Sequence, residues 1–347
     1  MHDSRMEMRP TEIDRLSLFL LGAGFNIDAT REAGPMYGDS IYVGRYQIDC
    51  SYPLVGDVLK LCFGLDKLPA GKTVENLFAE HLQAGNYKPM ETLVDRLMEA
   101  DYRIASKLAL SRSSNSYKKF FESFNGAQFL TFNYDSLAEI FLSQDGSWQP
   151  EDGYAVPVLT ELAYGAKRPP NANSRSVVIH LHGSACVYTV QSEIVGTPGA
   201  GVAQLVRRPE PLYAFDADSI SHCFPHYRRV MSPTGCVRTE ERVIAPVPDK
   251  REGLKEAFIC ESYTKALQLV RQARSLIAVG YSFSPYDRAS YDPVLQTLAH
   301  SGVGDLMIVS PQAGELARRL STEYAGIRVQ PVEKSFGKWA TDEFSAP

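Results

Sequence analysis

The sequence of 347 residues lacks the features that mark several common classes of protein. No run reaches the roughly 18–20 consecutive apolar residues that a membrane-spanning helix needs. The chain also contains no Walker A phosphate-binding loop and no GxSxG nucleophile motif. We therefore expect neither a membrane protein, nor a P-loop nucleotidase, nor a serine hydrolase of the GxSxG type.

An excess of basic charge and paired cysteines are missing as well. The formal net charge is −5, which argues against strong direct binding to nucleic acid. The six cysteines form no CxxC pair, and residues 1–15 are polar and mixed in charge, unlike a signal peptide. We therefore expect a cytoplasmic protein with free thiols.

What the chain does contain is a set of short apolar runs bounded by Gly, Asn and Asp. Their near-continuous apolar character is typical of strands that are buried on both faces of a parallel sheet. Between the runs, apolar residues recur at helical spacing in residues 73–84, 90–110 and 254–273. The runs themselves are Leu18–Leu21, Phe129–Phe132, Val177–Leu181, Leu276–Val279 and Leu306–Val309.

The order of these patterns predicts an α/β fold with a Rossmann-like parallel sheet covered by helices. We expect a single domain over residues 1–347, with a helical insertion at 50–125. Residues 189–253 hold seven prolines and few periodic signals, so we expect an irregular loop insertion there. Ser310-Pro311 is expected to begin a further helix, as an N-cap followed by proline at the first helical position.

A distinctive segment follows each of four predicted strands. In a parallel sheet these segments emerge at the same carboxyl edge, where open α/β sheets bind their ligands. Taken singly they are weak signals, since the first lacks the third glycine of a dinucleotide-binding motif and the acidic residue of the second could simply cap a helix. The segments are Gly22-Ala23-Gly24-Phe25-Asn26, Asn133-Tyr134-Asp135, His182-Gly183-Ser184 and Gly280-Tyr281-Ser282-Phe283-Ser284.

Together, and in this order, the four segments resemble those of the sirtuin superfamily. Sirtuins carry Gly-Ala-Gly near the start, then Thr-x-Asn-x-Asp, then His-Gly, and Gly-x-Ser near the end. Here these are residues 22–24, 131–135, 182–183 and 280–282. The segment GYSFSPYD is more similar to bacterial SIR2-like antiphage-defence proteins than to deacylases, and the resemblance extends over residues 16–312.

The resemblance implies that the chain binds NAD+ at this edge. It implies that Asn133 and His182 are the catalytic pair, with Asn133 placing the attacking group and His182 acting as base at the ribose hydroxyls. Asp135 would support the Asn133 loop. The other implied NAD+ contacts are Gly22, Ala23, Gly24 and Asn26 at the phosphates, Gly280 and Ser282 at a phosphate or the adenosine ribose, and Ser310 on the adenosine side.

The sequence departs from the sirtuin deacylases in two places. Asn26 stands where they carry serine, and the Asp-Phe-Arg of their next segment is missing, so that Asp28 is a candidate for a polar contact in the nicotinamide pocket. The two CxxC pairs of their zinc ribbon are absent as well.

Two groups of residues could be interpreted as metal ligands. The spacing His-Cys-x2-His-x9-Cys of residues 222–236 matches no zinc pattern, so unrelated core and surface residues are the more frequent explanation for His222, Cys223, His226 and Cys236. Residues 180 and 182 are both histidines and share a strand face, but the first is more simply a hydrogen-bonded core histidine. We therefore expect no bound metal.

The resemblance favours one function and leaves two alternatives open. The favoured hypothesis is an NAD+ glycohydrolase that releases nicotinamide and ADP-ribose, as a gated effector of bacterial antiphage defence. The alternatives are an NAD-dependent protein deacylase or ADP-ribosyltransferase, and a non-catalytic module that senses NAD or ADP-ribose. Because an ungated NADase would harm its host, we also expect a homo-oligomer or a defence partner, such as an ATPase or an Argonaute-like protein.

Overall fold

The computed structural model describes most of the chain. The described residues are 17–34, 41–43, 46–48, 51–161, 173–190, 194–195, 204–205, 213–215, 229–232, 235–302 and 304–344.

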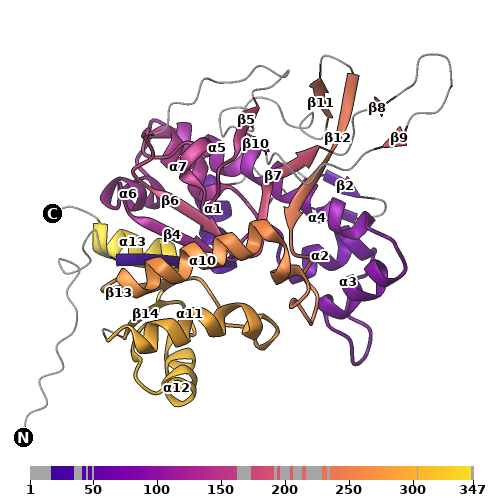
Figure 1. Ribbon diagram of the computed structural model, residues 1–347. Helices are drawn as coiled ribbons and strands as arrows, with labels where there is room; N and C mark the ends of the chain where they lie inside the picture. The colour runs from indigo at the N-terminus through magenta and orange to yellow at the C-terminus, as the bar shows by residue number, and fades with distance from the viewer. Residues whose placement is uncertain are drawn as a thin grey trace, which may run out of the picture.

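A six-stranded parallel sheet forms the centre of the molecule (Figure 1). Its strand order is β15-β14-β13-β1-β4-β6, and every neighbouring pair is parallel. The five strands predicted from apolar runs are all present, so the predicted α/β class is confirmed. The six strands of the sheet are β1 (Ser17–Leu21), β4 (Gln128–Thr131), β6 (Val177–His180), β13 (Ser275–Val279), β14 (Asp305–Val309) and β15 (Arg328–Val332).

The sixth strand, β15, was not predicted from the sequence, and its place in the sheet explains why. It lies at the edge, with every residue partly or fully exposed, and it contains Pro331. An edge strand does not need the continuous apolar run of a central strand, and it tolerates proline because one side of its backbone is unpaired.

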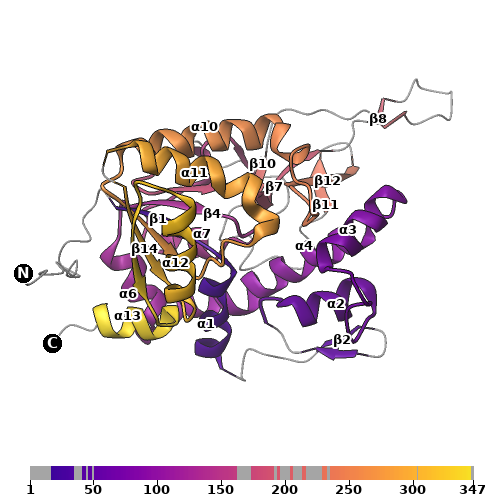
Figure 2. The ribbon, with the colours of Figure 1, turned by 90° about the horizontal axis from the view of Figure 1, so that it is seen from below.

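Helices cover both faces of the sheet, because alternate strand residues point to opposite sides. On one face Phe19, Phe129 and Ile277 pack with the first core cluster, under α1, α5, α6, α7 and α13. On the other face, Leu20 and Ala278 pack under α10, α11 and α12. Figure 2 shows α10 and α11 on one side of the sheet and α6 and α13 on the other. The helices are α1 (Ala23–Ala33), α5 (Ser106–Leu110), α6 (Ser116–Ser123), α7 (Leu137–Gln144), α10 (Ala257–Gln272), α11 (Arg288–His300), α12 (Ala313–Glu323) and α13 (Phe336–Phe344).

Aromatic rings make up much of the first core cluster. The Phe19 ring stacks on Phe129 of the neighbouring strand, with centroids 5.3 Å apart, and meets Phe120 edge-on. Phe336 of α13 lies 4.4 Å from the Phe25 ring of α1. The last helix therefore closes over the first, and both are held to the sheet by large buried rings.

A helical segment connects β1 to β4, the first two strands of the central sheet in chain order. Residues 73–84 form a helix as predicted, and residues 90–110 form a helical run interrupted by a π-helical turn at Asp101–Ala105. A short antiparallel pair, β2 (Ile41–Val43) and β3 (Tyr46–Ile48), precedes them. The helices of this segment are α2 (Val55–Phe63), α3 (Val74–Gln83) and α4 (Lys88–Ala100), followed by α5 and α6.

The stretch 189–253, predicted to be irregular, contains strands of a second sheet in its described part up to Val243, whereas residues 244–252 have no regular secondary structure. This sheet has the order β11-β12-β7-β10-β5 and is mainly antiparallel. Apart from Ala185–Tyr188 of β7, which are apolar and buried, its strands are short or carry polar and charged residues, so they give little apolar pattern for sequence analysis to detect. The remaining elements are β5 (Leu159–Glu161), β7 (Gly183–Val190), β8 (Ile194–Val195), β9 (Gln204–Leu205), β10 (Tyr213–Phe215), β11 (Arg229–Ser232), β12 (Gly235–Val243), α8 (Pro150–Gly153) and the 3-10 turns η5 (Gly253–Lys255) and η6 (Pro285–Asp287).

No helix among the described residues is long and apolar enough to cross a membrane.

Candidate functional site

The strand order identifies one place in the sheet where a ligand-binding crevice is expected. From β1 the chain winds outward through β4 and β6 on one side, and through β13, β14 and β15 on the other. The direction of winding therefore reverses between β1 and β13. In open α/β sheets such a switch point, at the carboxyl ends of the strands, is the usual site for a ligand.

Glycines bring the ends of β1 and β13 into direct backbone contact. The Gly22 N–H donates to Val279 O at 3.0 Å, and the Gly24 N–H donates to Gly280 O at 2.8 Å. A Cβ on Gly24 would lie 2.8 Å from Gly280 O, and Gly280 itself has a φ of +66°. The Gly-Ala-Gly turn thus needs its glycines for this close approach, and the Gly22 and Gly24 amides are already used within the protein.

The groups left at this edge are the start of α1 and the loop after β13. Ala23, the first residue of α1, is exposed, and Ser282 is exposed on the neighbouring loop. Gly22 is the N-cap of α1 and offers no side-chain acceptor, while the Gly24 and Phe25 amides donate to the carbonyl oxygens of Gly280 and Gly22. The positive end of the helix dipole therefore faces the switch point, an arrangement that suits an anion.

The loop after β13 contains an unusual backbone conformation that sequence analysis did not find. Phe283 has a φ of +49°, although its side chain is fully buried. The Arg319 Nη2 atom of α12 donates to Phe283 O at 2.7 Å. A bulky residue in the left-handed region persists only where its surroundings enforce it, so this loop is held in one shape beside the exposed Ser282.

On the other side of β1, the structure brings three predicted site residues together. The Asn133 Nδ2 atom donates to Asn26 Oδ1 at 3.1 Å, which joins the loop after β4 to α1. Asn26 also hydrogen-bonds to the buried carboxyl group of Asp135. The Asn133 N–H is held by the Thr131 hydroxyl at 3.0 Å. The Asn133 side chain is thus fixed by hydrogen bonds while the residue stays partly exposed.

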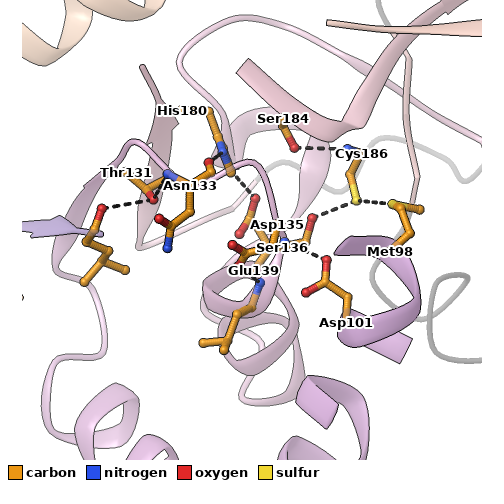
Figure 3. A network of polar contacts seen from close by, with 12 residues as sticks. Met98, Asp101, Thr131, Asn133, Asp135, Ser136, Glu139, His180, Ser184 and Cys186 are labelled. Atoms are coloured by element: carbon orange, nitrogen blue, oxygen red, sulfur yellow. Dashed lines mark hydrogen bonds and ion pairs between the residues drawn. The ribbon is translucent and has the colours of Figure 1, made fainter. Parts of the chain in front are cut away.

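His180 supports this loop from β6, behind Asn133 (Figure 3). Its Nδ1 lies 2.9 Å from the Asn133 carbonyl oxygen and its Nε2 lies 2.5 Å from Glu139 Oε1. Burial alone would lower the pKa of His180, but the charge and hydrogen bond of Glu139 outweigh burial and raise it. His180 is therefore a hydrogen-bonded core histidine, as the sequence predicted.

A buried acidic residue anchors the far end of the same loop (Figure 3). Asp101, at the start of the π-helical turn, accepts hydrogen bonds from the Tyr52 hydroxyl at 2.6 Å and from the Ser136 N–H at 2.8 Å. Burial and the charge of Asp135 raise the pKa of Asp101 well above its usual range. Burial likewise raises the pKa of Asp135 to about 6. Sequence analysis missed Asp101, because nothing in the pattern of a charged residue on a helix marks it as buried.

His182, the predicted base, is buried and lies on the other side of the loop. It is 3% exposed, and its Nε2 lies 2.8 Å from Ser290 Oγ in α11. Its ring packs 4.8 Å from the Phe132 ring. Burial lowers the pKa of His182 well below its usual range, and the positive charge of Lys250 lowers it further. The imidazole is therefore neutral near pH 7, which a general base requires.

The glycine after His182 is required by the second sheet. Gly183 has a φ of +82°, and an added Cβ would collide with the Arg242 carbonyl group of β12. The Ile244 N–H donates to His182 O at 2.8 Å. The His-Gly pair is thus the point at which the chain leaves the parallel sheet and enters the antiparallel one.

Asp28 and Ser310, two further predicted contact residues, make hydrogen bonds within the protein. The Asp28 Oδ2 atom accepts the Gly337 N–H of α13 at 2.7 Å, so Asp28 ties two helices together and is not free for a nicotinamide contact. Ser310 follows β14 at the expected edge, but its hydroxyl accepts the Gln312 N–H and α12 begins only at Ala313. The predicted N-cap is therefore two residues too early.

The candidate zinc ligands in residues 222–236 are only partly described by the structure. Among the described residues, no three His, Cys, Asp or Glu side chains gather as metal ligands. Within that part of the chain, Cys62, Cys186 and Cys260 are free thiols. His222, Cys223 and His226 lie outside the described residues.

No protein-family model matches the chain, and no curated protein matches it. Comparison with solved structures finds Sir2 homologues. One is a mutant Sir2 homologue in complex with ADP-ribose, 13% identical, with a TM-score of 0.41, covering 94% of this chain and 90% of that one. Another is a Sir2 homologue–NAD complex, 14% identical, with a TM-score of 0.41, covering 94% and 88%. A third, from work on the mechanism and regulation of Sir2 enzymes, is 11% identical, with a TM-score of 0.42, covering 94% and 90%. Values of this size establish no residue equivalences.

Proposed function

We propose that the protein is an NAD+ glycohydrolase that cleaves NAD+ to nicotinamide and ADP-ribose. The observation that carries the proposal is the meeting of four segments at the switch point of the sheet. Two of them, at the ends of β1 and β13, are in backbone contact. The other two, at the ends of β4 and β6, supply Asn133 and His182.

The anionic part of the dinucleotide would bind where the protein offers positive potential. The start of α1 supplies the helix dipole, with Ala23 exposed. Because the Gly22 and Gly24 amides are used within the protein, their contribution is the close backbone approach rather than direct hydrogen bonds to phosphate. The exposed Ser282 hydroxyl, on the rigid loop after β13, is a further donor at that edge.

The chemistry asks little of the protein beyond positioning and a base. Nicotinamide leaves as a neutral group, so the transition state resembles an oxocarbenium ion at C1′ of the ribose, and a water molecule adds to that carbon. Asn133, held by Asn26 and by Thr131, would place the water. His182 would accept its proton, because burial and Lys250 keep the imidazole neutral. The products are nicotinamide, ADP-ribose and a proton.

Product analysis tests the proposal against its two alternatives. Purified protein is incubated with NAD+, with and without an acetyl-lysine peptide, and nicotinamide, ADP-ribose and modified peptide are separated. We expect nicotinamide and free ADP-ribose in equal amounts and independent of the peptide. Peptide-dependent nicotinamide release would indicate a deacylase or transferase instead. Tight NAD+ binding with no turnover would indicate a sensing module.

We further propose that the activity is gated, in a homo-oligomer or by a partner, as in bacterial antiphage defence. The support is the resemblance of GYSFSPYD to SIR2-like defence proteins and the cost to a cell of uncontrolled NAD+ loss. Light scattering combined with the NADase assay, and the identity of neighbouring genes, test this. A fully active monomer that cells tolerate at high expression would contradict it.

A further inference from the structure

His182 is held by residues that none of the four sequence segments contains. Its Nε2 atom lies 2.8 Å from the Ser290 hydroxyl, 108 residues away in the chain. Ser290 is fully buried, and its carbonyl oxygen accepts the Tyr263 hydroxyl of α10 at 3.1 Å. Ser290 is therefore fixed at its main chain and presents its hydroxyl to the histidine ring.

A partly buried ion pair holds the beginning of the helix that carries Ser290. Lys250 is 6% exposed, and its Nζ atom pairs with Asp287 Oδ1. Asp287 is the N-cap residue of α11, three residues before Ser290. The segment that supplies Lys250 leaves β12 at Ile244, whose N–H holds the His182 carbonyl oxygen. One short stretch of chain thus contacts His182 and the start of α11 together.

The contact with Ser290 decides which nitrogen of His182 can act. A neutral imidazole has one N–H donor and one acceptor nitrogen, and the Ser290 hydroxyl can accept from Nε2–H or donate to an unprotonated Nε2. Nε2 is occupied by Ser290, so Nδ1 is the nitrogen that remains for the substrate. For Nδ1 to accept a proton, Nε2 must carry the hydrogen and donate it to Ser290 Oγ.

We propose that Ser290, with the Lys250–Asp287 ion pair that holds the start of its helix, is a positioning residue that presents His182 to the substrate through Nδ1. This inference rests on the proposed NAD+ hydrolysis for its effect on turnover. The proton of the attacking water, or of a ribose hydroxyl, then moves to Nδ1, while the Nε2–H···Ser290 hydrogen bond keeps the ring in place.

The charged and titratable groups around His182 support this arrangement. Lys250 comes from the segment after β12, its partner Asp287 from the start of α11, and Tyr134 from the loop after β4, with its ring 6.3 Å away. Burial and Lys250 lower the pKa of His182, whereas burial raises the pKa of Tyr134 so that it stays neutral. Loss of Lys250 is therefore expected to move the His182 pKa upward.

The first experiment compares Ser290→Ala with Ser290→Thr, which keeps the hydroxyl, and with Ser262→Ala. Ser262 is a matched control, since it is 1% exposed and its Oγ has no hydrogen-bond partner within the described chain. We expect Ser290→Ala to lower kcat about 10-fold with little change in KM, as expected for loss of an orienting contact. Ser290→Thr should recover most of the rate, and Ser262→Ala should behave like the native protein.

The second experiment reads the histidine directly and does not need turnover. Nitrogen-15 NMR of the full chain, with His182 assigned from a His182→Gln variant, reports the tautomer and the pKa. We expect the Nε2–H tautomer in the native protein, a tautomer mixture in Ser290→Ala, and a higher His182 pKa in Lys250→Met. The Lys250→Met pH–rate profile should lose activity at a higher pH on its acid side than the native profile.

The two readouts separate the failure of this inference from failure of the proposed function. If NAD+ is hydrolysed, but Ser290→Ala matches Ser262→Ala in both rate and tautomer, the inference is overturned. An Nδ1–H tautomer in the native protein also overturns it. If no variant, including the native protein, hydrolyses NAD+, the proposed function fails, and the NMR result still decides how His182 is held.

Discussion

Asn133 and His182 follow neighbouring strands of one sheet, yet the structure holds them in different ways. Asn133 lies in a loop whose backbone and side chains are tied at several points, to Thr131, Asn26 and His180. The ring of His182 is held at Nε2 by Ser290, with a buried cation nearby. Asn133 is thus fixed at its backbone and its side chain by three hydrogen bonds, two of them from distant parts of the chain, whereas the His182 ring is held by one hydrogen bond beside a buried cation.

This difference indicates what each side contributes. Hydrogen bonds to Asn26, Thr131 and His180 define the position of Asn133, and the residue stays partly exposed. The few contacts around His182 instead define a protonation state and a ring orientation. A position can be secured by redundant contacts, whereas a protonation state depends on the charge and burial of particular groups. Substitutions should therefore affect the two sides differently.

The largest effect is expected at the backbone contact between Gly24 and Gly280, which joins the ends of β1 and β13. Gly24→Val places a side chain against Gly280 O, only 2.8 Å from the added Cβ, and should separate the ends of β1 and β13. We expect NAD+ binding to be lost and stability to fall by about 3 kcal/mol or more, as for overpacking against a backbone that cannot move away. Calorimetric titration and urea unfolding measure both effects.

Gly56→Val is the control for this substitution, because nothing lies within 4 Å of a Cβ at that position. If Gly24→Val bound NAD+ as well as Gly56→Val does, the crevice between β1 and β13 would not be the binding site.

Removal of either proposed catalytic side chain, Asn133 or His182, should have the next largest effect. Asn133→Ala and His182→Ala are each expected to reduce nicotinamide release on the order of 10²-fold or more, with NAD+ binding changed little. His180→Ala is no neutral control, since His180 Nδ1 contacts the Asn133 carbonyl oxygen. The matched controls are Asn125→Ala and His300→Ala, at a partly exposed and an exposed position.

Binding measured by calorimetry separates the two interpretations of a loss of rate. Should either variant lose NAD+ affinity in parallel with its rate, that residue would hold the dinucleotide rather than act on it.

Two substitutions of Asp101, which anchors the Asn133 loop, should differ clearly in their effect on stability. Asp101→Ala leaves Tyr52 and the Ser136 N–H without their buried acceptor, and we expect a loss of about 3 kcal/mol. Asp101→Asn keeps an oxygen that accepts the Ser136 N–H, and its amide group can donate to the Tyr52 hydroxyl. Its loss of stability should therefore be much smaller. Urea unfolding of both variants tests this, and equal losses would mean that the carboxylate charge itself is required.

A smaller effect is expected from the pH dependence of stability. The Asp135 pKa is raised to about 6 by burial, against 3.8 for a free carboxyl group. The folded state therefore holds a proton between pH 4 and 6 that the unfolded state has released, so this group's contribution is present below pH 4 and is lost as pH rises through 6. Over that interval the loss is on the order of 2 kcal/mol. In Asp135→Asn the decline should be reduced, and an unchanged decline would assign it to another group.

Metal removal should affect neither the Asn133 region nor the His182 region. The two CxxC pairs are missing from the sequence, and no metal cluster is present within the described ranges. Protein purified without added zinc should contain well below one equivalent, and chelation should leave both activity and unfolding unchanged. One tightly bound zinc per chain, lost in Cys223→Ser or Cys236→Ser, would restore the deacylase alternative.

The central sheet could be predicted from sequence because each of its inner strands is buried on both faces. Such strands are apolar at nearly every position, as β1 and β13 are except for Ser17 and Ser275, and that composition is visible without any knowledge of partners. The motif glycines were visible for a related reason, since glycine is needed where two backbones touch. Most strands of the second sheet, and β15, were missed because they are short or carry polar and charged residues, so that their apolar pattern is weak; the buried run Ala185–Tyr188 of β7 is the exception.

The α/β class, the inner strands and the residues at their carboxyl ends could all be predicted from the order of amino acids alone. Which of those residues meet, and what holds them, depends on the folded arrangement. It paired Asn26 with Asn133 across 107 positions, placed Asp101 under the Ser136 amide, and set Ser290 against His182. These contacts depend on how helices far apart in the chain pack on the sheet. Local sequence carries the tendency to form a strand or helix, but it does not carry the distance between two side chains brought together by folding.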